Sequence, residues 1–103
     1  MKQVTLWILA PFFRAEFYTV SRSEEILARE LFTKGAYVPV TMDDRGGLAA
    51  EEVAEEMFDL TNNPSREEER ERDYGRGPSL STGDIVQVGD VKVVCCSFGW
   101  KRL

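Results

Sequence analysis

The chain has 103 residues, of which 43% are hydrophobic, and a formal net charge of −5. That length gives room for one domain with one modest core, and no apolar run is long enough for a transmembrane helix. Histidine is absent, which removes the commonest general base and the commonest metal ligand. Residues 46–73 carry ten acidic and three basic side chains, so we expect no direct binding to DNA or RNA.

The cysteine content and the first residues indicate the cellular compartment. Cys95 and Cys96 are adjacent, and neighbours on a strand point to opposite faces, so a disulfide between them would distort the backbone. The apolar run Val4–Phe13 lacks a small-residue cleavage site, so we expect no signal peptide. These features predict a protein of the reducing cytoplasm with two buried thiols.

The first third of the chain predicts two strands and then a helix. Val4–Leu9 is β-branched, aromatic and almost wholly apolar, which indicates a central strand buried on both faces. Ala10–Arg14 contains a proline and is expected to turn the chain, and Glu16–Val20 is expected to be a second short strand.

A helix is predicted next, because Ser21-Arg-Ser-Glu24 has the spacing of a capping box. We expect this helix to run to about Lys34 and to end at Gly35. Its inward face is predicted to consist of Ile26, Leu27, Leu31 and Phe32.

The middle of the chain predicts a strand and a second helix. Ala36–Met42 is the strand, placed at a sheet edge or a bulge because Pro39 cannot donate to a strand ladder. A loop at Asp43–Gly47 precedes the helix Leu48–Thr61, which ends before Pro64 because the residue preceding a proline avoids the helical region. The apolar face of this helix is predicted to be Leu48, Val53, Ala54, Met57, Phe58 and Leu60.

Residues 65–78 are predicted to be a mobile polar link within the single domain. Ser65–Asp73 has no apolar residue. It could extend as a charged helix through Glu–Arg pairs, but the sequence indicates nothing that would anchor such a helix. Tyr74–Pro78 is predicted to be a flexible loop.

The clearest local pattern is a hairpin in the last quarter of the chain. Its strands, Asp84–Val88 and Val91–Phe98, are joined by Gly89-Asp90, which suits the positive-φ positions of a two-residue turn. The register then runs from Val88 opposite Val91 to Ile85 opposite Val94. One face of this hairpin is all valine, and the other is polar at the tip and apolar further in.

These elements together predict an α+β fold. The order is ββαβα, a polar link, and ββ, which fits a mixed or antiparallel sheet of four to five strands. We expect two helices on one face of that sheet, and we expect the C-terminal β-hairpin to belong to it.

An acidic face on the second predicted helix is the main candidate for a binding site. It consists of Glu51, Glu52, Glu55, Glu56 and Asp59, and no lysine or arginine interrupts it. Like charges four residues apart destabilise an isolated helix by about 0.2–0.5 kcal/mol per pair. The face is either an ordinary solvated surface or a docking surface for a basic patch on a partner protein.

Two other groups of residues suggest chemistry that their spacing does not support. Asp84, Asp90 and Lys92 resemble an acidic nuclease site, but the two aspartates would lie about 20 Å apart at ~3.3 Å per strand residue. Cys95 and Cys96 cannot complete a zinc site without histidine or further cysteines, unless carboxylates or another subunit contribute. We therefore predict no catalytic residues, no metal site and no cofactor.

The chain ends in two aromatic and two cationic residues. Phe98 and Trp100 are expected to close the core, while Lys101 and Arg102 stay in solvent. The alternative is a surface patch for a ligand or a partner.

Three motifs follow one another in the C-terminal half: Phe58-Asp-Leu-Thr-Asn-Asn-Pro64, Ser79-Leu-Ser-Thr-Gly-Asp-Ile85 and Ser97-Phe-Gly-Trp-Lys-Arg-Leu103. Their combination resembles small uncharacterised proteins encoded by phages, plasmids and prokaryotic genomes, among them the YodL-like group. The resemblance begins at the second helix and does not extend to the first 35 residues. It implies an accessory protein of a mobile element and no known activity.

The expected function is therefore protein–protein contact by a small non-enzymatic accessory protein of the cytoplasm. One expected role is inhibition of a host nucleic-acid-handling or defence complex, whose phosphate-binding surface the acidic face would occupy. The alternative is a structural module that associates with itself through the valine face or the Phe98/Trp100 end. A small enzyme or a metal-dependent nuclease is the remaining hypothesis.

Overall fold

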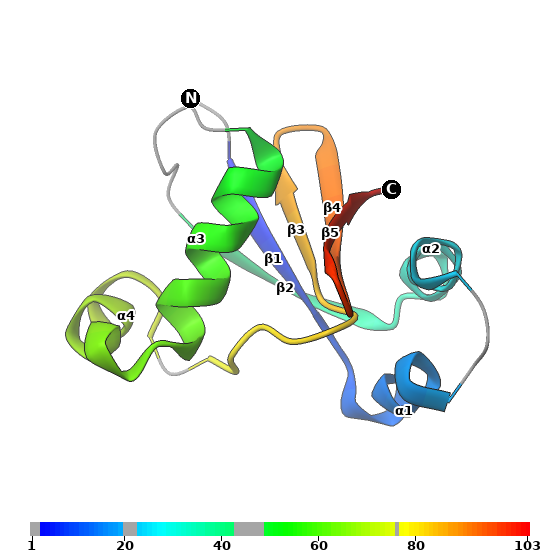
Figure 1. The fold of residues 1–103 in the computed structure, drawn as a ribbon, viewed down its shortest axis with the longest axis horizontal. Coiled ribbons are helices and arrows are strands. Elements are labelled where there is room, and N and C mark those ends of the chain that lie inside the picture. The colour runs from blue at the N-terminus through cyan, green and yellow to red at the C-terminus, as the bar shows by residue number, and fades with distance from the viewer. Residues whose placement is uncertain (1–2, 20–22, 43–48, 76) are drawn as a thin grey trace.

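The computed structural model describes residues 3–19, 23–42, 49–75 and 77–103, which form an α+β fold (Figure 1). Five antiparallel strands make one sheet in the order β2-β1-β3-β4-β5. In chain order the elements are β1 (Val4–Leu9), α1 (Pro11–Thr19), α2 (Glu24–Thr33), β2 (Tyr37–Met42), α3 (Ala50–Asn62), a 3₁₀ turn (Pro64–Arg66), α4 (Glu67–Asp73), β3 (Ile85–Val88), β4 (Val91–Cys96) and β5 (Gly99–Arg102).

The predicted hairpin is present in the predicted register. β3 and β4 pair from Ile85 opposite Val94 to Val88 opposite Val91. Gly89 in the turn has a φ of 59°, the left-handed conformation that such a turn requires. β1 is an interior strand between β2 and β3, and β2, which carries Pro39, lies at the sheet edge. The positions predicted for these strands are confirmed.

The sheet is covered by helices on both faces, whereas two helices on one face were expected. α3 packs on the face that carries Leu6, Val86 and Val93. α1 and α2 pack on the other face, against Ile85 and Val94. The physical reason is that the second face of the hairpin is apolar away from its tip, and those side chains also need a cover.

The predicted strand Glu16–Val20 is wrong as far as the structure describes it, because residues 16–19 belong to the helix α1; Val20 lies outside the described residues. Pro11 occupies the first position of this helix, where its missing N–H costs nothing. Phe13 and Phe17 are four residues apart and both pack on the core, a helical spacing that the β-like composition concealed.

The helix predicted from the capping-box spacing of Ser21 and Glu24 is confirmed as α2, with two differences from the expectation. Ser21 lies outside the described residues, and Ser23 precedes the helix with its Oγ donating to Glu25 instead of capping the backbone. Ile26, which was expected to face the core, is 46% exposed. Gly35 follows the helix with a φ of 76°, as predicted.

α3 confirms the second predicted helix and most of its apolar face. Val53, Ala54, Met57 and Leu60 are buried, and Phe58 is half-buried. The helix ends at Asn62, before Pro64. Leu48 and the loop Asp43–Gly47 lie outside the described residues.

The last strand, β5, was not predicted. Its presence determines where the two terminal aromatic side chains, Phe98 and Trp100, lie. Gly99–Arg102 pairs with β4, so that Trp100 stands opposite Cys95. Phe98 lies in the turn between these two strands and is 97% exposed, so its expected place in the core is wrong. Trp100 packs on the core as a half-buried side chain.

Candidate functional site: the acidic face of α3 and the groove beside it

All five residues of the predicted acidic face lie on the side of α3 that turns away from the sheet, and each is at least partly exposed. The structure divides them into two groups, according to whether an arginine from elsewhere in the chain reaches them. The first group is Glu51, Glu56 and Asp59, and the second is Glu52 and Glu55.

Arg66 pairs with two of these carboxylates. Its guanidinium donates to Glu56 at 2.5 Å and to Asp59 at 2.8 Å, and it also binds Glu69 on α4. The hydrogen bond from Arg66 holds the pKa of Asp59 below its usual value. These contacts of Arg66 fasten α4 to α3, although the sequence indicated nothing that would anchor a helix in this segment. Whether residues 65–78 are mobile stays a prediction.

Arg102 on β5 pairs with Glu51 at the other end of the face. The guanidinium donates to both carboxylate oxygens of Glu51, at 2.6 and 3.0 Å. This pair lowers the pKa of Glu51 to about 2. The acidic face, which no cation interrupts in the sequence of the helix, is thus interrupted in space, because two arginines from outside α3 reach it.

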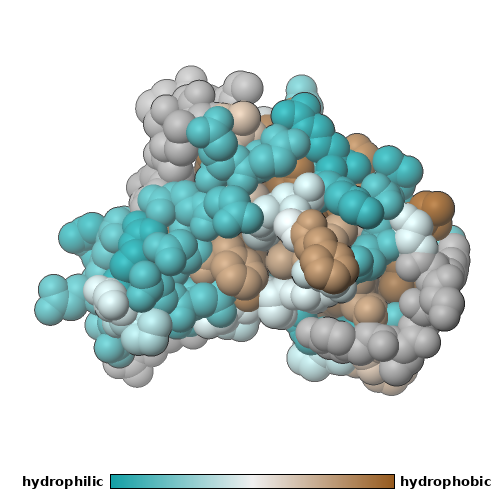
Figure 2. All heavy atoms as spheres, viewed as in Figure 1, coloured by the Kyte–Doolittle hydropathy of each residue, from teal (hydrophilic) through white to brown (hydrophobic). Residues whose placement is uncertain are grey.

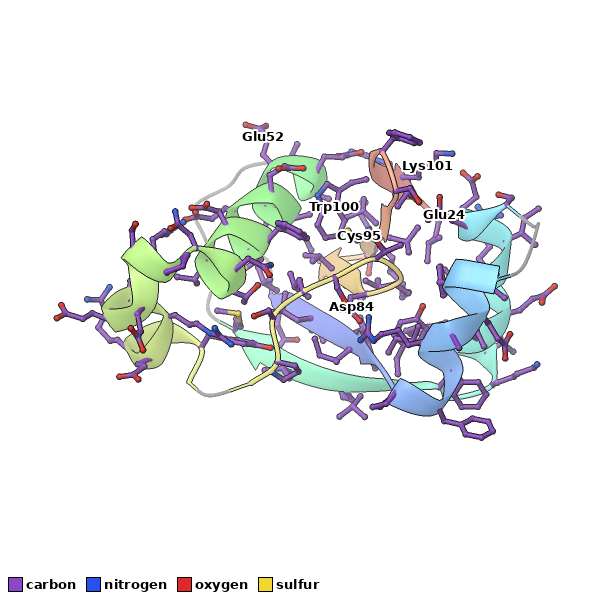
Figure 3. All side chains as sticks on the ribbon, turned by 60° about the horizontal axis from the view of Figure 1, so that its bottom comes forward. Glu24, Glu52, Asp84, Cys95, Trp100 and Lys101 are labelled. Atoms are coloured by element: carbon purple, nitrogen blue, oxygen red, sulfur yellow. The ribbon has the colours of Figure 1, made fainter. Side chains whose placement is uncertain are left out.

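Glu52 and Glu55 are the carboxylates of this face that stay unpaired within the described part of the chain. Both side chains are exposed, and neither hydrogen-bonds nor ion-pairs with another described residue. Figure 3 shows Glu52 pointing away from the body of the protein. These two residues therefore carry the negative charge that is open to another molecule.

A groove with a volume of about 430 Å³ lies between α3 and the β4–β5 turn, with Glu55 at its lip. Phe58 from α3 and Trp100 from β5 also line it, their ring centroids 6.3 Å apart in an edge-to-face arrangement. Figure 3 places Trp100 between α3 and β5, and Figure 2 shows hydrophobic atoms at the surface beside the hydrophilic side chains of α3 and α4. The remaining lining residues are Asn62, Leu80, Ser81, Thr82, Cys95, Cys96, Ser97 and Gly99.

The three C-terminal motifs singled out in the sequence meet at this groove, and two of them hold its wall together. Leu80 N–H donates to the Thr61 hydroxyl at 3.1 Å, and the Ser79 hydroxyl donates to the Thr61 carbonyl at 2.6 Å. The Asn62 amide donates to the Leu80 carbonyl at 3.0 Å. The Thr-Asn end of α3 therefore binds the Ser79-Leu80 segment, and the two motifs, 18 residues apart, act as one structural unit.

Asp84 continues this support below the groove and is fully buried. Its carboxylate accepts hydrogen bonds from the backbone N–H groups of Leu9 and Ser81, at 2.8 and 2.9 Å, and from Arg14 at 2.9 Å. Burial raises the pKa of Asp84, while these three donors favour the ionised form. The sequence did not single out Arg14, because its partner is 70 residues away.

The β4–β5 turn on the other side of the groove is fastened to α2. The carboxylate of Glu24 accepts hydrogen bonds from the backbone N–H and the hydroxyl of Ser97, at 3.1 and 3.3 Å. Lys101 lies 3.7 Å from the carboxylate of Glu25. The exposed Phe98 is therefore presented on a braced turn.

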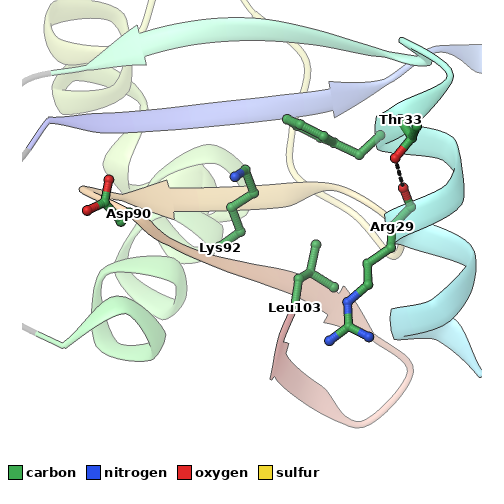
Figure 4. Close-up of a pocket in the computed structure, with 6 residues that line it drawn as sticks. Arg29, Thr33, Asp90, Lys92 and Leu103 are labelled. Atoms are coloured by element: carbon green, nitrogen blue, oxygen red, sulfur yellow. Dashed lines mark hydrogen bonds between the residues drawn. The ribbon is translucent and has the colours of Figure 1, made fainter.

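A second cavity, of about 360 Å³, has the opposite charge. Arg29 of α2 and Lys92 of β4 line it, together with Phe32 and Leu103 (Figure 4). The ammonium group of Lys92 lies 5.1 Å from the centre of the Phe32 ring, so the chain's own cation already covers that ring. Asp90 also borders this cavity, at the opposite end of β3 from Asp84, so the two aspartates do not converge.

The two cysteines are buried free thiols. Burial raises the pKa of Cys95 to about 12 and that of Cys96 to about 11. Among the described residues, no three cysteine, aspartate or glutamate side chains lie close enough to hold a metal ion.

Comparison of the chain with protein-family models, with curated proteins and with solved structures finds no match. Within the described ranges, α3 is the longest helix, at 13 residues, and no helix has both the length and the apolar character that a membrane crossing needs.

Proposed function

We propose that this protein is a small non-enzymatic accessory protein that binds a basic surface on a partner protein. The contact surface is the unpaired part of the acidic face together with the adjoining groove. The observation that carries the proposal is that Glu52 and Glu55 are exposed and unpaired in the described chain, and that Glu55 borders a groove lined by Phe58 and Trp100. Charge with a neighbouring aromatic pocket is a common composition of protein-binding surfaces.

The absence of catalysis is part of the proposal. Histidine and reactive thiols, which often supply acid–base or nucleophilic chemistry, are not available here, and the buried Asp84 is engaged. The sequence has no histidine, the thiols of Cys95 and Cys96 have raised pKa values, and Asp84 binds the backbone and Arg14. The groove thus offers recognition groups without an activated nucleophile or base.

The wider setting is proposed from the sequence resemblance. An accessory protein of a phage or plasmid acts on host machinery, and host proteins that handle nucleic acid expose basic, phosphate-binding surfaces. An acidic face would compete for such a surface, mainly through the encounter rate and the choice of partner. This proposal includes a cytoplasmic location and no direct binding to nucleic acid.

A charge-reversal experiment tests this function. The partner is isolated from the host with the wild-type protein, identified, purified and then titrated against variants. Glu52→Lys with Glu55→Lys should reduce its affinity at least tenfold, because two repulsive charges replace two attractive ones. Glu56 is left unchanged, because its ion pair with Arg66 would be broken.

The matched control is Glu68→Lys with Glu71→Lys on α4. These glutamates are also exposed, have the same spacing of three residues and undergo the same change in charge. Because both double variants change the net charge equally, any effect of net charge alone appears in both. The control should therefore lose much less affinity for the partner than Glu52→Lys with Glu55→Lys. Equal loss of affinity in both double variants would contradict a localised acidic site.

Self-association is the second candidate function. Of the two surfaces that could mediate it, the Phe98 end is favoured and the valine face is not. Val86, Val88 and Val93 are covered by α3, so the valine face is not open to a second copy. Phe98 is 97% exposed on a turn that Glu24 fixes to α2. If copies associate there, sedimentation equilibrium should show a dimer that salt does not weaken and that Phe98→Ser abolishes.

A further inference from the structure

We propose that the groove between α3 and the β4–β5 turn is a receptor for a single arginine side chain carried by the partner protein. The inference rests on the proposed function and names the group that the partner presents. It concerns the groove itself, not the charge of the acidic face as a whole.

The walls of the groove supply the two kinds of contact that a guanidinium group makes best. Phe58 and Trp100 provide aromatic surface, and Glu55 provides an unpaired carboxylate at the lip. A guanidinium is planar, so it stacks on an aromatic ring and at the same time donates parallel hydrogen bonds to a carboxylate. A lysine ammonium would keep the charge but lose the stacking and the paired hydrogen bonds.

Carboxylates lie around Cys95, one of the residues that line the groove. Burial raises the pKa of this thiol to about 12, and the charges of Asp84, Glu55 and Glu24 add to the rise. These carboxylates come from three separate parts of the chain. Arg14 pairs with Asp84, while Lys101 and Arg102 pair with Glu25 and Glu51. None of these cations pairs with Glu55, whose charge therefore stays open at the groove.

Two other aromatic rings in the described chain lie near a cation of the protein itself. Lys92 lies over Phe32, at 5.1 Å, and Arg70 lies over Tyr74, at 5.9 Å. No described cation lies over Trp100 in this way. The Trp100 ring is thus left open to a cation from another molecule.

The size of the groove fits one side chain. Its volume of about 430 Å³ is near the lower end of the range for ligand pockets, ~300–1,000 Å³. Such a volume accommodates a long side chain that enters from the surface, with the partner's backbone remaining outside. The braced walls described above mean that the groove exists before binding, which lowers the entropic cost of filling it.

The test is a titration of the full ¹⁵N-labelled chain with the peptide N-acetyl-Gly-Arg-Gly-amide, followed by NMR. The protein has two tryptophans, and their indole N–H signals report on opposite faces of the sheet. The Trp100 signal should shift in a saturable way. The Trp7 signal should stay in place, because its indole N–H donates to Gln87, away from the groove. The same peptide with citrulline, which has nearly the same shape and no charge, should bind about tenfold more weakly.

Two single variants locate the binding group. Glu55→Gln should weaken the arginine peptide about tenfold, as expected for losing one charge-assisted hydrogen bond. Glu52→Gln removes the same charge one helical turn away and should change the affinity less than about twofold. Both residues are exposed, so the remaining NMR signals should show an unchanged fold.

Three results would overturn the receptor: no shift of the Trp100 signal, equal binding of the citrulline peptide, or equal effects of the two glutamine variants. Each of these is distinct from failure of the proposed function. If the arginine peptide fails but the Glu52→Lys, Glu55→Lys variant still loses the partner, the acidic face binds without an arginine receptor. If that double variant keeps the partner, the proposed function is itself wrong.

Discussion

Two groups of carboxylates in this protein differ in what their oxygens contact. Asp84 is fully buried and accepts hydrogen bonds from two backbone N–H groups and from Arg14. Glu52 and Glu55 lie in solvent and have no partner in the described chain. A buried carboxylate with three donors stabilises the fold, whereas an exposed unpaired one contributes little to stability and is free to bind. The role of a charge here depends on its neighbours, not on its sign.

The largest expected effect is the loss of stability when the buried carboxylate, Asp84, is removed. Asp84→Ala leaves the N–H groups of Leu9 and Ser81 and the charge of Arg14 without their acceptor. We expect a loss of about 3–5 kcal/mol in the free energy of unfolding, a large part of the ~5–15 kcal/mol that a domain has. Urea unfolding followed by circular dichroism measures it. Glu55→Ala should keep the wild-type midpoint, and a similar loss in both variants would break the comparison.

Next in size is the removal of the Thr61 hydroxyl. Thr61→Val keeps the shape of the side chain but leaves the buried Leu80 N–H unpaired, at a cost of about 2 kcal/mol. Thr61→Ser keeps the hydroxyl and should cost clearly less. Urea midpoints of the two variants give the difference, and equal midpoints would mean that the hydrogen bond does not hold the Ser79-Leu80 segment.

The parts of the fold that could be predicted from the sequence are those fixed by local patterns. The register of β3 and β4 follows from the Gly89-Asp90 turn and the alternating valines, and α3 follows from its helical apolar spacing. α1 was missed because Phe-rich composition favours a strand, and only packing of Phe13 and Phe17 on the sheet decides for a helix.

The candidate site could be predicted only in part, for the same physical reason. The acidic residues of α3 share a helix and therefore a face, which periodicity alone indicates. Which of them are neutralised depends on Arg66 and on Arg102, which is 51 residues from its partner Glu51. The groove likewise depends on β5, a strand of four residues that the hairpin pattern did not include.

Substitution of two glycines tests how tightly the core beside Asp84 and the rim of the groove are packed. Gly99 borders the groove with a φ of 91° and has open space where a Cβ would lie, so Gly99→Ala should cost only the conformational strain, about 1 kcal/mol. Gly83 has a φ of 98°, and its Cβ would lie 3.1 Å from Leu9 and Phe17. Gly83→Ala should therefore cost more, about 2 kcal/mol. The melting temperatures of both variants test this order. A larger decrease for Gly99→Ala than for Gly83→Ala would contradict it.

The smallest expected effect is the pH dependence of the paired surface carboxylates. The pKa of Glu51 is about 2 in the folded protein and 4.5 in the reference state. A folded pKa that is lower than the unfolded one stabilises the protein above about pH 4.5, and this contribution is lost as the pH falls towards 2. Glu51→Gln should reduce the change of the urea midpoint with pH across that interval, whereas Glu52→Gln should not. Identical profiles for the two variants would show that the pair with Arg102 is not formed in solution.

The most direct test of the central claim is the salt dependence of the Kd for the purified partner, measured by calorimetry. The account predicts that the wild-type protein binds more weakly as the salt concentration rises, and that Glu52→Gln with Glu55→Gln removes most of this dependence while the fold stays stable. Glu68→Gln with Glu71→Gln should retain the wild-type dependence. If all three proteins show the same dependence on salt, the unpaired carboxylates of α3 are a solvated surface and not the binding site.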